Sequence, residues 1–207
     1  MAKVNGPLFS FSARGKIGDA LVFTPWKGLN NVRRYVIPSN PQSTGQVAQR
    51  SKMTAAVAAI HSAISTAAIL LADLDKSAYA LWASQVKTAT TWFNQATKNY
   101  IDVSVAGKKP TVFGGGVVTP GSSELEIHVF SEQIDATEIT AGKFFYGTSP
   151  TAMLSSIAAT ITSGTFEADK TIPSLTAGVK YYMQFVVDAG ENCEGAKSGI
   201  YHGVPTA

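Results

Sequence analysis

The chain has 207 residues, of which 45% are apolar and 15% are charged, and this composition excludes a disordered chain and indicates a globular protein with a real core. Its single cysteine, Cys193, excludes an internal disulfide, so the fold must depend on packing. The net charge of +3 hides a gradient, because residues 1–50 carry seven basic residues and one acidic residue, whereas residues 111–207 carry four and ten. This asymmetry predicts a basic docking end and an acidic, solvated end.

No segment indicates secretion or insertion into a membrane. The first ten residues, MAKVNGPLFS, lack the continuous apolar region of a secretory signal. The longest apolar run, TAAILLA, is too short to cross a bilayer. We therefore expect a protein that is made in a cytoplasm, holds together without disulfides and does not contact a membrane. If it reaches the outside of the cell, another process must carry it there.

Residues 1–42 are predicted to form a basic β-hairpin arm, because residues 15–41 open with glycine-punctuated strand patterns and close on two prolines. Cations and aromatic side chains gather there, and they form the candidate interface: Arg14, Lys16, Trp26, Lys27, Arg33, Arg34 and Tyr35. Such a mixture can anchor a protein interface, and it can also hold phosphates and stack on bases. We favour an acidic protein partner over nucleic acid, since no recognition helix or known nucleic-acid module is present. A solvated surface without a partner is the remaining alternative.

Residues 43–106 are predicted to form a long antiparallel helical hairpin. Ser43 followed by Gln46 has the spacing of a capping box at the start of a helix over residues 43–72. Apolar residues then recur every three or four positions, first at Met53, Val57, Ile60, Ile64, Ala67 and Leu71, and again at Tyr79, Trp82, Val86, Ala89, Phe93, Ala96 and Tyr100. We interpret these aromatic residues as core packing rather than as a cofactor site.

Residues 107–121 are rich in glycine and proline and are predicted to be a linker, followed by an antiparallel β-sandwich over residues 122–207. The sandwich is expected from short alternating segments, ELEIHVF, KFFYGT, VKYYMQFVVDA and GIYHGV. In SLTAGVKYY, Leu175 precedes Tyr181 by six residues, which resembles the tyrosine corner of fibronectin type III and immunoglobulin-like domains. The segment departs from those families in having no tryptophan. The fold class expected overall is α+β and multidomain.

No motif for catalysis stands out, and we expect no enzyme activity, cofactor or bound metal. The run Gly114, Gly115, Gly116 does not form a dinucleotide fingerprint, and AGKKPT lacks the hydroxyl residue of a P-loop. Cys193 lies between two glutamates, which raise a thiol pKa and so oppose activation. In ELEIHVF the polar residues alternate with apolar ones, so they are expected on the solvated back of a strand rather than in a metal site.

The order of the parts points to a family. A stretch SARGKIGDALVFTPWKG is followed by VRRYVIPSNPQSTGQVAQR, by helices containing SAYALWASQ and WFNQATKNYI, and by an immunoglobulin-like tail. In this order the chain resembles a group of uncharacterised virion proteins of tailed bacteriophages and prophages. The resemblance covers the first hundred residues through short motifs, and the C-terminal half matches only at the level of the module.

The resemblance implies a structural component of the virion, synthesised in the bacterial cytoplasm and released by lysis. It would be an accessory or decoration subunit of the head, neck or tail, bound to other virion proteins in several symmetry-related copies. A basic, aromatic hairpin can sit on an acidic patch or add to the sheet edge of a partner. Two alternatives stay open: an adhesin module that binds a glycan or protein of the host surface, and a nucleic-acid-binding protein. An exposed platform among Phe144, Phe145, Tyr146, Tyr182 and Tyr201 would favour the adhesin.

Overall fold

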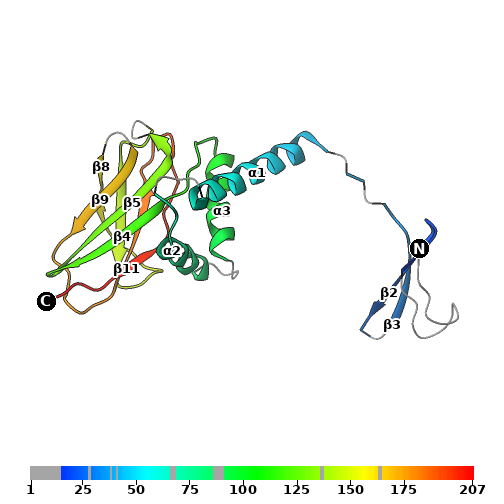
Figure 1. The fold of residues 1–207 in the computed structure, drawn as a ribbon, viewed down its shortest axis with the longest axis horizontal. Coiled ribbons are helices and arrows are strands. Elements are labelled where there is room, and N and C mark those ends of the chain that lie inside the picture. The colour runs from blue at the N-terminus through cyan, green and yellow to red at the C-terminus, as the bar shows by residue number, and fades with distance from the viewer. Residues whose placement is uncertain are drawn as a thin grey trace. The chain divides into compact units, whose positions relative to one another are not determined.

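In the computed structural model, the described residues form three helices and eleven strands, and the strands lie in three antiparallel sheets (Figure 1). The described residues are 15–27, 29–37, 39–40, 42–65, 69–85, 91–135, 138–162 and 165–207. The expected α+β class is confirmed. The chain divides into two compact units, Met1–Ser43 and Thr44–Ala207. Within the described ranges, no helix combines the length and the apolar character that crossing a membrane requires.

The first unit contains a three-stranded antiparallel sheet. Its strands, in spatial order, are β1 (Gly15–Ile17), β2 (Leu21–Trp26) and β3 (Leu29–Arg34). The expected hairpin is therefore present as β2 and β3, and β1 adds a strand that the sequence pattern did not indicate. Gly18 turns the chain from β1 to β2 with a φ of +55°, a conformation that glycine adopts without strain.

The second unit begins with three helices, so the predicted pair of long helices is wrong. They are α1 (Thr44–Ser65), α2 (Asp73–Ser84) and α3 (Trp92–Val105). The first predicted helix ends early: the Leu71 N–H donates to the carbonyl of Ala63 over 2.8 Å, so the chain has already turned back there. The second predicted helix is two helices. Thr91 marks the start of α3, because its hydroxyl accepts from the N–H of Asn94 (3.3 Å) and caps the helix.

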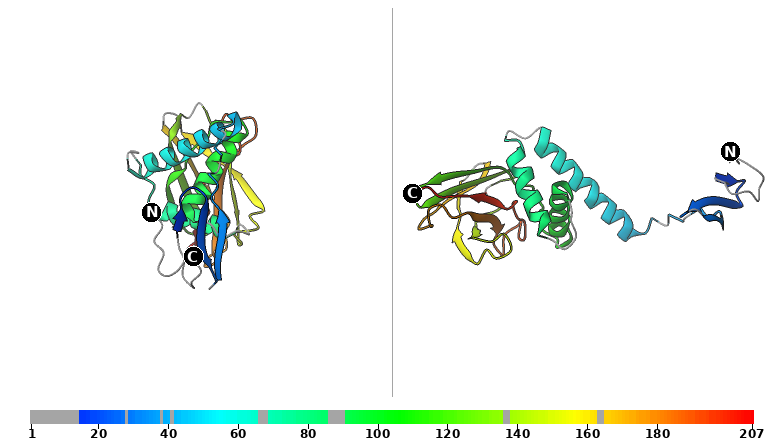
Figure 2. Two further views of the ribbon diagram at one scale, coloured as in Figure 1. Left: turned by 90° about the vertical axis from the view of Figure 1, so that its right-hand side faces the viewer. Right: turned by 90° about the horizontal axis from the view of Figure 1, so that it is seen from below.

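Eight strands follow and form two four-stranded sheets. They are β4 (Gly114–Gly121), β5 (Glu124–Asp135), β6 (Gly142–Gly147), β7 (Ser155–Ala158), β8 (Thr160–Thr162), β9 (Thr165–Ile172), β10 (Tyr181–Val187) and β11 (Tyr201–Gly203). One sheet has the order β4-β5-β9-β8 and the other the order β11-β10-β6-β7. The two sheets form one layered body with α2 and α3 at one end of it (Figures 1 and 2).

The inner faces of the two sheets form the main core. Leu125, Ile127 and Val129 of β5 are fully buried, as their alternation predicted. The rings of Phe166 in β9 and Phe185 in β10 meet across the sheets with centroids 5.8 Å apart. The Tyr181 hydroxyl accepts from the N–H of Thr176 (3.2 Å), and Met183, Phe185 and Val187 are buried beyond it. The backward bond of the predicted tyrosine corner and the register of β10 are thus confirmed, although the Tyr181 ring is half-buried rather than buried.

The predicted linker over residues 107–121 is wrong, and so is the separation of the helices from the sandwich. Most of that segment is β4, which pairs with β5 at Gly114 and again from Val117 to Gly121, with a register shift in between. Phe113, immediately before β4, is fully buried in the sandwich core, where its ring meets that of Phe185 at 5.4 Å. Ala78 of α2 and Val103 of α3 belong to the same core. Helices and sandwich therefore share apolar packing and form one unit.

Candidate functional site

The basic residues of the arm are divided between the two faces of its sheet. Lys16 and Arg33 both pair with Val22 in the register, on the strands that flank β2, so they share one face. Tyr35 contributes to this face, because the Lys16 ammonium lies 3.9 Å from the centre of its ring. Arg34 follows Arg33 directly and therefore leaves the sheet on the opposite side. The described members of the candidate interface are therefore split between two faces rather than gathered in one patch.

The remaining candidates of the arm have different surroundings. Lys16 also pairs with Asp19 over 2.6 Å, and this bond raises the pKa of Lys16. Lys27 is exposed in the turn between β2 and β3, with a φ of +48°. Arg14 lies outside the described residues, and so does the side chain of Trp26, although its backbone belongs to β2.

The arm has no core of its own among the residues that the structure describes. None of the side chains described between residues 15 and 43 is buried, and the most covered of them are only half-buried. Val32, Val36 and Ile37 are exposed to 52%, 68% and 74%. A small sheet gains stability in water only when it covers an apolar face. Among the described side chains, the sheet of the arm therefore has no covered apolar face.

The first half of α1 has the same character. Residues 44–55 contain no buried side chain, and burial begins only at Ala56 and Ile60. Val47 and Met53 are about half exposed, so Met53, the first residue of the predicted apolar stripe, is not covered. The views show this first half projecting beyond α2 and α3 (Figures 1 and 2). Most of the stability of a helix in a protein comes from the packing of its apolar face, so a partner surface would add stability to this half.

A buried carboxylate, which no sequence pattern indicated, joins α2 to the sandwich. Asp75, in the first turn of α2, is fully buried. Its Oδ2 accepts from the N–H groups of Ala72 (2.8 Å) and Gly115 (3.1 Å). Its Oδ1 accepts from the N–H of Gly116 (2.9 Å) and the hydroxyl of Tyr201 (2.6 Å). Four donors, from the N-cap residue of α2, from β4 and from β11, thus compensate the charge, and the positive N-terminal end of the helix dipole also stabilises a carboxylate at this position.

Two buried tyrosines complete this junction. The Tyr79 hydroxyl donates to the Phe113 carbonyl (3.1 Å) and accepts from the Phe113 N–H (3.3 Å). Burial raises the pKa of Tyr79 and of Tyr201, so both phenols stay protonated at neutral pH. Gly116 permits the close contact, since a Cβ there would lie 2.2 Å from the Tyr201 ring. The arrangement fixes α2 on the sandwich and offers no exposed reactive group.

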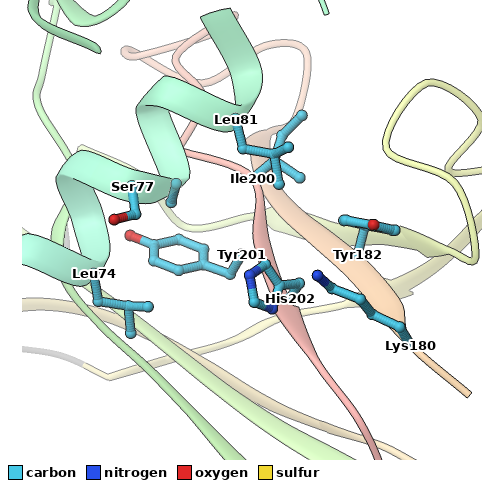
Figure 3. A pocket seen from close by; sticks show the side chains of 9 residues that line it. Leu74, Ser77, Leu81, Lys180, Tyr182, Ile200, Tyr201 and His202 are labelled. Carbon is cyan, nitrogen blue, oxygen red and sulfur yellow. The ribbon is translucent and has the colours of Figure 1, made fainter. Parts of the chain in front are cut away.

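A small pocket lies beside this junction, between α2 and the pair β10–β11 (Figure 3). Its volume is about 150 Å³. The lining residues come from one face of α2 and from the C-terminal strands: Leu74, Ser77, Ala78, Leu81, Lys180, Tyr182, Ile200, Tyr201 and His202. Apolar side chains of α2 and Ile200 form one side, while Lys180 and His202 lie close together at the other.

The residues with possible catalytic or metal-binding chemistry are not brought together. In the described part of the chain, no group of three or more His, Cys, Asp or Glu side chains could hold a metal ion. His128 lies 4.0 Å from Glu167 and has no other acidic neighbour in an ion pair among the described residues. Cys193 is buried, and burial, together with the charge of Glu138, raises its thiol pKa to about 11.

The aromatic residues considered for an adhesin do not form an exposed platform. Phe144 and Tyr201 are buried, and Phe145, Tyr146 and Tyr182 are half-buried. No protein-family model matches the chain, and neither does any curated protein.

Proposed function

We propose that the chain is a structural subunit of a tailed bacteriophage virion, an accessory or decoration protein of the head, neck or tail. It docks through its basic N-terminal arm and is present in several symmetry-related copies. One observation carries this proposal. Between residues 15 and 55, none of the described side chains is buried, whereas the described residues from Ala56 onward contain two clusters of buried apolar side chains.

An extended segment without its own core is what an assembly protein uses to bind its neighbours. Ordering such a segment costs conformational entropy, and only a partner surface that buries its apolar side chains offsets this cost. Val32, Val36 and Ile37 supply the apolar contacts, and Lys27, Arg33 and Arg34 supply charges. Charges of one sign steer the arm to an acidic partner and oppose binding to a basic one. The partner is therefore another virion protein with an acidic surface that carries apolar residues.

The sandwich is proposed to be an immunoglobulin-like module that the arm holds on the particle. The order β4-β5-β9-β8 corresponds to strands A, B, E and D of that fold, and β11-β10-β6 corresponds to G, F and C, with β7 as one further strand. The backward bond of Tyr181 at the start of β10, the F position, supports the same assignment. The helix junction at Asp75 then makes the module a rigid extension of α2.

The proposal is tested by reversing charge on the arm and measuring incorporation into particles. The double variant Arg33→Glu with Arg34→Glu places two acids where an acidic partner is expected, one on each face of the sheet. Like charges across an interface cost several kcal/mol, so incorporation should fall by more than tenfold.

A control variant with the same change in charge is Lys76→Glu with Lys98→Glu, at a half-buried position of α2 and an exposed position of α3, where both lysines form ion pairs only within their own helices. Its incorporation should equal that of the unaltered chain, because each of these surface pairs contributes little to stability. Equal incorporation of the arm variant and the control would show that the arm cations are only a solvated surface.

A further inference from the structure

The pocket between α2 and the β10–β11 pair combines an apolar wall with positive charge. Leu74, Ala78 and Leu81 are spaced by four and three residues, so they lie on one face of α2. Ile200 is held against this face, since its N–H donates to the Ala78 carbonyl over 3.0 Å. The volume of about 150 Å³ equals that of protein cavities that hold a benzene molecule.

The cationic side of the pocket has no acidic partner among the described residues. None of the described residues that line the pocket is Asp or Glu, and their titratable groups are those of Lys180, Tyr182, Tyr201 and His202. Lys180 makes no ion pair with a described carboxylate, and its ammonium lies 5.3 Å from the centre of the Tyr182 ring. The Tyr182 ring in turn meets His202 edge to face, with centroids 6.2 Å apart. Figure 3 shows the Lys180 ammonium directed toward His202.

The positive charge of Lys180 disfavours the protonation of His202. Burial, and next the nearby Lys180 ammonium, lower the pKa of His202 below its ordinary value. An anion held between the two side chains would pair with Lys180 and would make protonation of His202 easier. The Asp75 carboxylate, bonded to the Tyr201 hydroxyl, already has four donors and adds no free acceptor on this side.

We propose that this pocket binds a carboxylate attached to an apolar group of about the size of a benzene ring. The apolar group lies against Leu74, Leu81 and Ile200, and the carboxylate pairs with Lys180 beside His202. Nothing in this site depends on docking of the arm. For a ligand of this size and an open pocket, the dissociation constant should be on the order of 1 mM. Either a free aromatic acid or the C-terminal carboxylate of a peptide ending in an apolar residue has this chemistry.

The probe is sodium benzoate, titrated into the full chain and followed by the backbone amide signals in NMR spectra. Saturable shifts should appear at Lys180, Tyr182 and His202. Benzamide has the same shape without the charge, and acetate has the charge without the ring, so each should bind at least fivefold more weakly. Equal shifts with benzoate and benzamide, or no saturable shift at these residues, would overturn the proposal.

Two variants separate the charge from the shape of the pocket. Lys180→Met keeps the length of the side chain and should weaken benzoate binding at least fivefold. Lys143→Met, an exposed position on β6 outside the pocket, is the matched control and should leave binding unchanged. Unchanged binding in Lys180→Met would contradict the proposal.

Because carboxylate binding favours protonated His202, benzoate should bind more tightly at pH 5.5 than at pH 7.5, and His202→Gln should remove this difference. A pH dependence that persists in His202→Gln would count against the assigned geometry. An acetylated Gly-Leu dipeptide that binds more tightly than benzoate, and more tightly than its own amide, would identify a peptide end as the ligand. Tighter binding of benzoate than of the dipeptide would identify a free acid.

Discussion

The substitution Asp75→Asn isolates the junction between α2 and the sandwich, because it keeps the shape of the side chain and changes only its charge and its hydrogen bonds. The carboxylate accepts two N–H groups at Oδ2, and one N–H and one hydroxyl at Oδ1. An asparagine has only one oxygen in place of Oδ1 and Oδ2, so its NH₂ group must face the two donors that one of these oxygens now accepts from. The least costly orientation keeps the oxygen toward Ala72 and Gly115 and turns the amide toward Tyr201, whose hydroxyl can rotate to accept.

In that orientation the N–H of Gly116 loses its acceptor in a buried site, and the remaining bonds lose the charge of the acceptor. A buried donor without a partner costs about 1–3 kcal/mol, and bonds to charged groups are stronger than neutral ones by about 1 kcal/mol. Asp75→Asn should therefore lower the free energy of unfolding by roughly 2–4 kcal/mol. Asp75→Ala, which leaves all four donors without an acceptor, should cost more.

The assay is denaturant unfolding of the full chain, with the slopes compared to check that the unfolded state is unchanged. The control is Asp73→Asn, two residues earlier on α2, where the carboxylate is almost fully exposed and pairs only with Lys76. Its effect should be negligible. If Asp75→Asn changed stability no more than Asp73→Asn, the carboxylate would not be the link between α2 and the sandwich.

Three further outcomes are expected. Tyr181→Phe should lower the free energy of unfolding by about 0.5–1 kcal/mol, because the N–H of Thr176 loses its acceptor but can donate to water instead. Tyr182→Phe should change the free energy of unfolding less. A larger loss at Tyr182 would refute the corner. At pH 8 a disulfide reagent should modify Cys193 about a hundredfold faster in denaturant than in the native chain, because a thiol with a pKa of about 11 is almost wholly protonated. Equal rates would refute its burial. Limited proteolysis of the free protein should cut within residues 15–55 and spare residues 107–121, and early cleavage in the latter would contradict the shared core.

The strands of the sandwich could be predicted because one face of each is buried and the other is not. Leu125, Ile127 and Val129 alternate with polar residues and are all buried. A period of two of this kind indicates a strand with one buried face. The same reasoning failed for β4. In the sequence, its glycines are typical of a flexible linker. In the structure, Gly116 is required for packing, because the Tyr201 ring occupies the space where a Cβ would lie.

The helices were predicted in the correct region but with the wrong number. The apolar spacing from Tyr79 to Tyr100 is consistent with one continuous helix, and a stripe alone cannot show where the backbone breaks. The cap at Thr91 was a local signal for the break. The Asp75 junction could not be predicted, because three of its four donors are backbone N–H groups, which have no sequence signature, and Tyr201 is 126 residues away.

The most direct test of the proposed function is quantitative mass spectrometry of purified phage particles from the strain that encodes the chain. The proposal predicts that the chain is present at a fixed copy number relative to the major capsid and tail proteins, and that a chain lacking residues 1–43 is made in the cell but is missing from the particles. Absence of the intact chain from the particles would contradict a structural role in the virion. Incorporation of the truncated chain at the full copy number would contradict docking through the arm.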